Sequence, residues 1–302
     1  MEFDTPRIME LLERMEQNYS LRPRHPEREG IYADYRARSE RLRASMPDRK
    51  VYAYATPARC AIDWFPASAA HAAPAEGVPL FVFIHGGFWR ALDREIFSFM
   101  AEHYVKAGVA VAMIGYELAP AVRLGRIVEQ VADAFVWLNR RAGELGFDPR
   151  RVSVSGHSAG GHLAAMISAT PPTSLEGHPL VATIPVSGLF SLAPLLLTSI
   201  NHDVRMTPHE AMRLSPSEMQ RFYTGEFIVA VGEAETEGFI GQSRDFAAAA
   251  KAAGSRATLE IVPRRTHFDV LEDLASPELA LFQRVLGAVK GVPQLSDSHS
   301  IR

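Results

Sequence analysis

One segment constrains this 302-residue chain more than any other. A run rich in valine and serine at residues 152–155 leads into Gly-x-Ser-x-Gly at residues 156–160 and then into a helix-forming stretch. The pattern predicts a strand that turns sharply into a helix and lifts Ser158 clear of the end of a sheet, the position of a nucleophile. Gly156 and Gly160 are expected there because a Cβ at either position would clash as the turn closes.

The composition narrows the class of protein. Hydrophobic residues make up 47% of the chain, enough for one large α/β domain or two small ones. The net charge is −3, with acids and bases mixed along the chain, so no nucleic-acid or membrane partner is expected. Cys60 is the only cysteine, which excludes an intrachain disulfide and a thiolate metal cluster and favours a reducing, cytoplasmic location. The N-terminus lacks the pattern of a signal peptide, and no window is apolar enough to span a bilayer.

Strand and helix patterns alternate from residue 50 onward. This alternation predicts an α/β fold with an eight-stranded, mostly parallel sheet that has helices on both faces. The expected strands lie at 50–55, 60–65, 79–85, 109–115, 151–155, 180–187, 226–231 and 257–262. The expected helices lie at 93–106, 126–144, 160–169, 236–253 and 268–290.

The segments outside this alternation divide the chain further. Residues 1–48 are charged and helix-friendly and are expected to form an N-terminal helical arm. The α/β domain then covers 49–290, and 291–302 form a polar tail. Residues 188–223 are too long for a simple connection, so we expect a small helical cap that faces the substrate; the alternative is a surface insertion with no role in chemistry.

A serine nucleophile needs a base and a group that orients the base. In hydrolases with such a strand-to-helix turn, the acid and then the histidine follow the nucleophile along the chain. His267 comes directly after the last strand and is the predicted base for Ser158. The loop after the preceding strand offers three acids, of which we choose Glu235 because it lies in the middle of the loop. Glu233 is the second choice, and Glu237 is expected to open the next helix.

Acyl transfer also builds negative charge on the substrate carbonyl oxygen, which N–H donors must stabilise. The loop at 85–90 follows a buried strand and contains Gly86 and Gly87, which allow the backbone to approach the substrate. The predicted oxyanion hole lies in this loop, at Gly86, Gly87 and Phe88, together with the N–H of Ala159.

Several other side chains are candidate substrate contacts. Phe88 and Trp89 are predicted to form a wall of the pocket, with a place in the core as the alternative. His157, next to the nucleophile, is a further candidate, although a structural histidine is the alternative, and the His85 side chain is expected to bond within its own loop. Four arginines could bind a substrate carboxylate, with a solvated surface charge as the alternative for each: Arg90, Arg205, Arg264 and Arg265.

Four segments together resemble the kynurenine formamidase (arylformamidase) branch of the α/β-hydrolase superfamily. They are 85–89 (HGGFW), 156–162 (GHSAGGH), 235–243 (ETEGFIGQS) and 266–269 (THFD). The resemblance implies the triad Ser158, Glu235 and His267, and hydrolysis of N-formylkynurenine to formate and kynurenine without metal or cofactor. This chain departs from animal members, which carry Asp where Glu235 stands and Tyr where Phe88 stands.

The predicted function is therefore a serine hydrolase that cleaves an aryl formamide, amide or small ester through an acyl-enzyme. A carboxylesterase acting on short-chain esters is the alternative, because many sequences with this loop pattern are esterases or amidases. A non-catalytic binding protein of the same fold is a second class, and a metal-dependent hydrolase is disfavoured because no His-x-x-x-His or comparable ligand spacing occurs. Apolar residues in the arm and at 195–197 are compatible with a homodimer.

Overall fold

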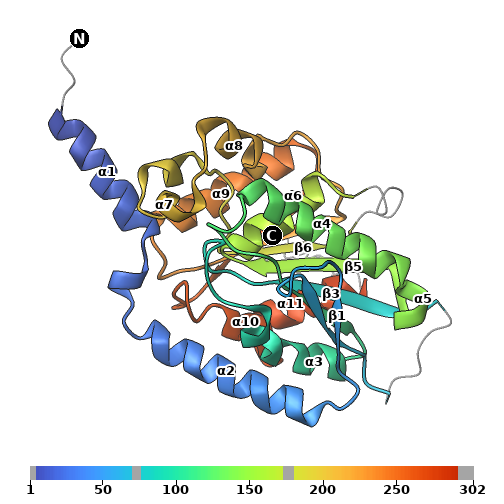
Figure 1. The fold of residues 1–302 in the computed structure, drawn as a ribbon. Coiled ribbons are helices and arrows are strands. Elements are labelled where there is room, and N and C mark those ends of the chain that lie inside the picture. The colour runs from blue at the N-terminus through green and yellow to red at the C-terminus, as the bar shows by residue number, and fades with distance from the viewer. Residues whose placement is uncertain (1–4, 70–75, 173–179, 292–302) are drawn as a thin grey trace, which may run out of the picture.

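The computed structural model describes residues 5–69, 76–172 and 180–291. The predicted tail beyond residue 291 lies outside these ranges. An eight-stranded sheet runs through the molecule in the order β1-β2-β4-β3-β5-β6-β7-β8 (Figure 1). Its strands are β1 (Lys50–Ala53), β2 (Ala61–Phe65), β3 (Val78–Ile84), β4 (Ala110–Ile114), β5 (Phe147–His157), β6 (Thr183–Val186), β7 (Glu226–Gly232) and β8 (Arg256–Val262). Among the described strands, β2 alone runs opposite to the others, pairing antiparallel with β1 and with β4, so the predicted fold class is confirmed.

The strand pairing brings the ends of the central strands to one edge. Ile84 at the end of β3 pairs with Gly156 of β5, and His157 pairs with Val186 at the end of β6. Gly232 at the end of β7 pairs with Val262 of β8. The loops that follow β3, β5, β6, β7 and β8 therefore emerge side by side, where parallel sheets form their sites.

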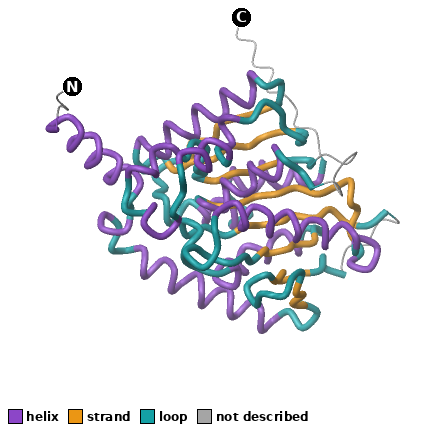
Figure 2. Tube along the Cα trace, turned by 45° about the horizontal axis from the view of Figure 1, so that its top comes forward, coloured by secondary structure: helices purple, strands orange, loops and turns teal. Residues whose placement is uncertain are grey.

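Helices cover both faces of the sheet (Figures 1 and 2). Alternate residues of β3 show why: Leu80 and Val82 join one buried cluster and Phe81 and Phe83 join another, because successive side chains of a strand point to opposite faces. One face carries α4 (Leu124–Arg140), α6 (Ala159–Ala169) and α9 (Glu237–Ala252); the other carries α3 (Ala101–Lys106), α10 (Leu271–Ala275) and α11 (Ala280–Lys290).

Some predicted helices are divided. The expected helix at 93–106 begins as the 3-10 helix η2 (Arg94–Met100), and α4 is followed by the separate short helix α5 (Ala142–Leu145). The expected helix at 268–290 is two helices, α10 and α11. Ser276 precedes Pro277 and adopts an extended conformation, because a residue before proline disfavours the helical region.

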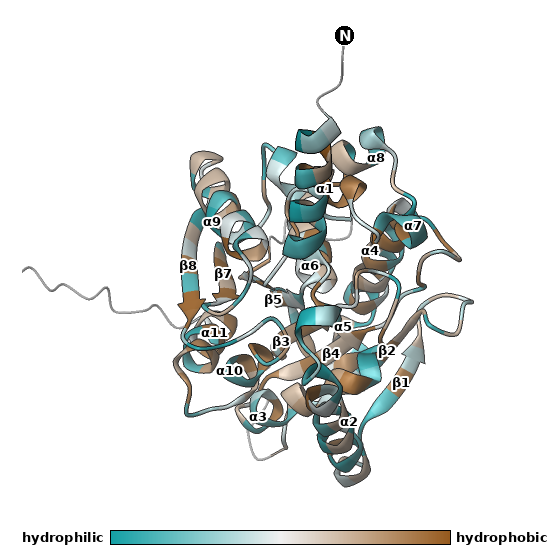
Figure 3. Cartoon of the chain, turned by 90° about the vertical axis from the view of Figure 1, so that its left-hand side faces the viewer, coloured by the Kyte–Doolittle hydropathy of each residue, from teal (hydrophilic) through white to brown (hydrophobic). Residues whose placement is uncertain are grey.

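The N-terminal arm contains α1 (Thr5–Tyr19), the 3-10 turn η1 (Arg22–Arg24) and α2 (Arg28–Ser45). The first part of α1 projects from the body (Figure 1). The face of α1 that Figure 3 shows is largely hydrophilic, but Ile8, Met9 and Leu11 are exposed apolar residues of the same helix. By contrast, α2 lies along the domain: the buried ring of Tyr35 stacks on Phe99 at 4.5 Å, and its hydroxyl donates to the Phe268 carbonyl at 3.1 Å. The arm is thus packed against the α/β domain through α2.

The insertion at 188–223 is helical, as expected. It contains η4 (Ala193–Leu197), α7 (Asn201–Val204), α8 (Pro208–Arg213) and η5 (Pro216–Glu218). The buried Gln242 amide of α9 holds its start, accepting from the N–H groups of Phe190 and Ser191 and donating to the Tyr19 hydroxyl of the arm. Arm, insertion and α9 therefore meet at one side chain. Across the described ranges, no helix has both the length and the apolar character needed to cross a bilayer.

Candidate active site

Ser158 stands at the turn between β5 and α6, as the sequence predicts. Its backbone has φ 55° and ψ −117°, a sparsely populated conformation for a residue with a Cβ and the conformation of a nucleophile at a sharp strand-to-helix turn. The Ser158 N–H donates to the Val186 carbonyl at 2.8 Å, which fixes the turn to β6. The side chain is buried.

Gly156 and Gly160 are required by close backbone approach. A Cβ on Gly156 would lie 2.1 Å from the Gly160 carbonyl oxygen, and one on Gly160 would lie 2.0 Å from the Ile84 carbonyl oxygen. Neither contact is possible without moving backbone. The predicted steric reason for both glycines is confirmed, and the second contact presses α6 against the start of the loop after β3.

His267 and Glu235 form a buried pair. The imidazole Nδ1 lies 2.7 Å from the Glu235 Oε2, and the two side chains are 5% and 0% exposed. The other carboxylate oxygen accepts from the Gly232 N–H at 2.8 Å and from the Ser187 hydroxyl. With both oxygens occupied, the carboxylate is fixed, and it in turn fixes the His267 ring with Nε2 available for chemistry.

The other acids of this loop are engaged elsewhere. Glu233 is exposed and accepts from the Arg264 N–H at 2.9 Å. Glu237 lies in the first turn of α9, as predicted, and pairs with Arg244 at 3.3 Å. Of the three, Glu235 alone contacts His267 in the part of the chain that the structure describes.

The loop after β3 lies directly against the nucleophile. A Cβ on Gly86 would be 2.8 Å from the His157 carbonyl oxygen and 3.2 Å from the Ser158 Cβ. Gly87, Phe88 and Trp89 all have positive φ, at 108°, 49° and 56°, so the backbone makes a tight left-handed turn beside the serine.

The N–H groups near the nucleophile come from this loop and from α6. Ala159 is the first residue of α6, and the first N–H groups of a helix have no partner within it. Of the other predicted donors, Gly86 lies next to Ser158, and Gly87 and Phe88 line the same cavity as Ser158.

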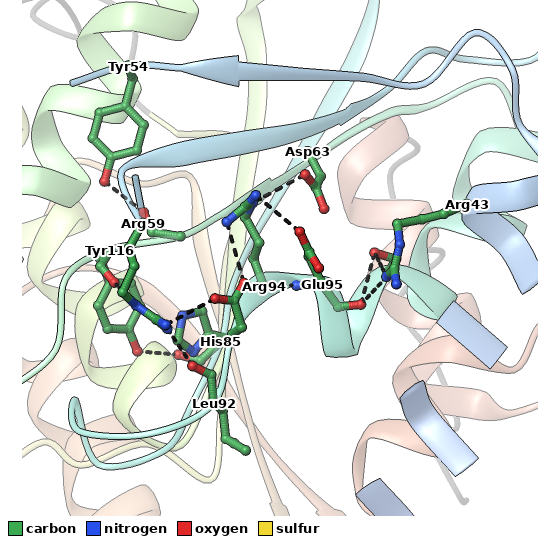
Figure 4. A network of polar contacts seen from close by, with 12 residues as sticks. Arg43, Tyr54, Arg59, Asp63, His85, Leu92, Arg94, Glu95 and Tyr116 are labelled. Atoms are coloured by element: carbon green, nitrogen blue, oxygen red, sulfur yellow. Dashed lines mark hydrogen bonds and ion pairs between the residues drawn. The ribbon is translucent and has the colours of Figure 1, made fainter. Parts of the chain in front are cut away.

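His85 is fixed inside this loop. Its Nδ1 is 2.8 Å from the Gly86 carbonyl oxygen, and its ring stacks on Tyr116 at 4.3 Å, whose hydroxyl donates to the His85 carbonyl (Figure 4). Burial lowers the pKa of His85 to about 4, so the ring is neutral near pH 7. Below it, Arg59 donates to the Leu92 carbonyl oxygen, which ties the far end of the loop to the domain.

A small cavity of about 50 Å³ opens beside the nucleophile. Ser158 and His267 both line it, and so do Phe88 and His157, two of the predicted substrate contacts. Burial, and then the charge of His267, lower the pKa of His157 well below its usual value, so His157 faces the cavity as a neutral ring. The remaining lining residues are Gly87, Leu92, Phe268, Leu21, Arg22, Arg28 and Tyr32.

Two predictions about the pocket are wrong. Trp89 does not line this cavity: it is fully buried, and its ring packs edge-on against His162 at 5.0 Å, because the left-handed turn places it in the core. Residues 188–223 do not line it either. The cavity is covered instead by Leu21, Arg22, Arg28 and Tyr32 of the arm, and no sequence signal indicated that the arm lies there.

None of the four arginines proposed as carboxylate ligands lines the cavity. Arg90 pairs with Asp203 of the insertion, and Arg265 pairs with Asp269 and Asp273. The remaining two, Arg264 and Arg205, are exposed. The arginines at the cavity are Arg22 and Arg28, which the sequence did not single out.

The described residues contain no group of three or more His, Cys, Asp or Glu side chains arranged to hold a metal ion. Two larger hollows, of about 820 and 900 Å³, lie between α2 and β1 and between α1 and the insertion. Neither includes Ser158, His267 or Glu235. The small cavity is therefore the one that joins the nucleophile to the candidate base.

Comparisons with known proteins agree with this geometry. The BD-FAE family model matches residues 68–182. A kynurenine formamidase from Salmo salar is 34% identical over 216 residues, covering 69% of this chain and 72% of that protein. The carboxylic ester hydrolase LipN from Mycobacterium tuberculosis is 38% identical over 117 residues, covering 37% and 31%.

A solved structure titled a putative thioesterase, from Silicibacter, is 31% identical, covers 91% of this chain and 98% of its own, and has a TM-score of 0.78. A Thermogutta terrifontis esterase at 23% identity and TM-score 0.64, covering 82% and 93%, shares the fold. The chain is an α/β-hydrolase enzyme that belongs to the kynurenine formamidase family.

Proposed function

We propose that this protein hydrolyses an aryl formamide, N-formylkynurenine or a close analogue, to formate and the free aryl amine. The observation that carries the proposal is the buried contact of His267 with Glu235 beside the cavity that Ser158 lines. The kynurenine formamidase relative supports the substrate class. No metal or cofactor is needed for such a reaction.

Each residue then has one role. His267 takes the proton of Ser158 as Oγ attacks the formyl carbon, while Glu235 stabilises the imidazolium. The N–H groups of the loop at 86–88 and of Ala159 stabilise the oxyanion. The C–N bond breaks as His267 returns the proton to the leaving amine. Water, deprotonated by the same histidine, then attacks the formyl-enzyme and releases formate.

The size of the cavity favours a small acyl group. On the same measure of volume, a cavity needs about 10–15 Å³ to hold one water molecule, so about 50 Å³ accommodates a group of formyl or acetyl size beside Ser158. A longer acyl chain would collide with Phe88 or with the arm. Glu235 is longer than aspartate by one methylene, and its contact with His267 supports it as a working replacement.

A short-chain carboxylesterase is the second candidate, because an ester can use the same nucleophile, base and oxyanion donors, and an ester hydrolase is among the relatives. Assays of N-formylkynurenine and of phenyl acetate on one preparation separate the two. Turnover of the ester without turnover of the formamide would favour the esterase.

Ser158→Ala tests the mechanism itself. We expect kcat to fall by at least about 10⁴-fold on both substrates, because covalent catalysis is removed. The unfolding midpoint should stay near that of the unaltered protein. A fluorophosphonate probe should label the unaltered protein and not the variant. A variant that keeps near-native turnover, or a folded protein that is not labelled, would contradict the mechanism and favour a binding protein.

We also propose a cytoplasmic location, supported by the single cysteine Cys60, which is buried and free. Cell fractionation tests it. Ultracentrifugation across a concentration range tests the predicted homodimer.

A further inference from the structure

The cover of the cavity is built from the turn η1 and the first turns of α2. Arg22, Arg28 and Tyr32 reach the cavity from this cover, opposite Ser158 and His267. None of these three takes part in the proposed formyl transfer. The presence of two guanidinium groups and a phenol beside the cavity therefore needs another explanation.

Arg28 shapes the turn. Its guanidinium donates to the Arg22 carbonyl at 2.8 Å and to the His25 carbonyl at 3.1 Å, and it pairs with Glu29 at 2.8 Å. These bonds hold the main chain of η1 and place Arg22 at the cavity. The charge of Arg28 is thus already balanced by Glu29.

Arg22 is different. Its main chain is held by Arg28, yet within the described ranges its guanidinium has neither an ion pair nor a side-chain hydrogen bond. Arg22 and Tyr32 line the same cavity. Burial raises the pKa of Tyr32 to about 12, and among the nearby charges Arg22 opposes that rise most. Tyr32 is therefore a neutral donor near pH 7, beside an unbalanced positive charge.

The carboxylates around this cover are engaged by other cations. Asp269 pairs with Arg265 at 3.5 Å, and Glu272 pairs with Arg38 at 2.6 Å. The described residues that line the cavity include no Asp or Glu. An unpaired guanidinium and a phenol at the mouth of a site are a match for a carboxylate, which Arg binds through two parallel hydrogen bonds.

We propose that Arg22, assisted by the Tyr32 hydroxyl, binds a carboxylate carried by the leaving group of the substrate. This inference rests on the proposed function. The space beside Ser158 is much smaller than the roughly 300 Å³ or more of most ligand sites, so the aryl leaving group must extend out of it toward the arm. It then lies against the arm, within reach of Arg22. The substrate class is accordingly narrowed to aryl amides or esters with an anionic group distant from the scissile bond.

Matched substrates test the proposal on the full chain. One pair is 4-acetoxyphenylacetate and 4-acetoxyphenylacetamide, which differ in charge and hardly in shape; the other is N-formylkynurenine and its primary carboxamide. We expect the unaltered protein to prefer the carboxylate member by about tenfold or more in kcat/KM, since the carboxamide cannot form the charge-assisted hydrogen bonds that a carboxylate accepts from arginine. Added salt should reduce the preference.

Three variants locate the effect. Arg22→Gln should raise KM for the carboxylate substrates about tenfold and leave kcat/KM for the carboxamide members within about twofold. Arg22→Lys should restore part of the preference, because it keeps the charge, and Tyr32→Phe should remove a smaller part. Arg41→Gln, at an exposed arginine of α2 that does not line the cavity, is the matched control and should keep the full preference.

The outcomes separate this inference from the proposed function. Equal turnover of the carboxylate and carboxamide members by the unaltered protein would overturn the carboxylate site and leave the hydrolase intact. An equal loss on both members in Arg22→Gln would assign Arg22 to the structure of the turn and would also overturn it. No turnover of any of the four substrates, with no fluorophosphonate labelling of Ser158, would overturn the proposed function and this inference with it.

Discussion

The N-terminal arm and the insertion at 188–223 are both additions to the same sheet, but they relate to the nucleophile in different ways. The insertion follows β6, one strand away from Ser158, yet it does not line the cavity. The arm begins more than a hundred residues earlier in the chain, and it covers the cavity with Arg22 and Tyr32. Proximity along the sequence is thus a poor guide to which segment lines this cavity.

The two segments are also attached differently. The arm packs on the histidine loop itself: Tyr35 bonds to the Phe268 carbonyl, and the Tyr32 ring lies 5.9 Å from that of Phe268. The insertion is held by polar contacts to α6, to α9 and to the loop after β3, through His162, Gln242 and Arg90. Changes in the arm should therefore alter substrate binding, whereas changes in the insertion should mainly alter stability.

The largest effect is expected from Tyr35→Ala in the arm. Removing this buried ring should lower the free energy of unfolding by about 3–5 kcal/mol and raise KM, because α2 loses its main contact with the domain. Tyr35→Phe is the control and should cost only about 1 kcal/mol. Urea denaturation and steady-state kinetics measure both. An unchanged KM in a folded Tyr35→Ala variant would show that the packing of the arm does not influence substrate binding.

The insertion should respond to acid through His162. Its Nε2 donates to the Leu214 carbonyl at 2.8 Å, and burial lowers its pKa to about 4. The unfolded chain binds this proton near pH 6.5, so the stabilisation is complete above that pH and is lost as the pH falls toward 4. Between pH 7 and pH 5 the loss should be about 2 kcal/mol.

His162→Gln cannot titrate and should lack this part of the pH dependence in urea denaturation. In the unaltered protein, hydrogen exchange at pH 5 should increase in 188–223 before it increases in α2. If hydrogen exchange increased in α2 before it increased in 188–223, the arm and not the insertion would be the acid-sensitive segment.

A smaller effect is expected where the chain enters the insertion. Ser187→Ala removes one of the two groups that hold the inner oxygen of Glu235, so the His267 ring should be less well fixed. We expect kcat to fall roughly tenfold, with KM within about twofold and an altered pH–rate profile. Ser191→Ala, four residues along, is the matched control. An equal change in both variants would mean that Ser187 acts only through folding.

The smallest effect is expected from the ion pair between Arg90 and Asp203. Both side chains are partly exposed, at 21% and 47%, and such pairs contribute about 0–1 kcal/mol. Asp203→Asn should therefore change the unfolding free energy by less than about 1 kcal/mol and kcat/KM by less than about threefold. A tenfold loss in kcat/KM would show that the insertion controls the loop after β3.

Much of the site could be predicted because its determinants are local. The glycines around Ser158 are fixed by backbone contacts within five residues and with the end of one neighbouring strand. The order of strands placed His267 and the loop of Glu235 at the same edge. The sequence alone gave no contact by which to choose between Glu235 and Glu233. In the structure, the Gly232 N–H and the Ser187 hydroxyl donate to Glu235 and hold its carboxylate in place.

The amino-acid sequence by itself determined the α/β fold, the turn at Ser158 and the residue types of the candidate triad, because alternation of apolar residues and steric exclusion at glycines act over short distances. Only the tertiary structure decided that Trp89 enters the core and that Arg22 and Tyr32 cover the cavity. The first outcome depends on the left-handed turn of the loop after β3 and on packing against His162. The second depends on how α2 packs against parts of the domain that are far from it along the chain. Such packing is set by the sum of many weak contacts, which no local pattern records.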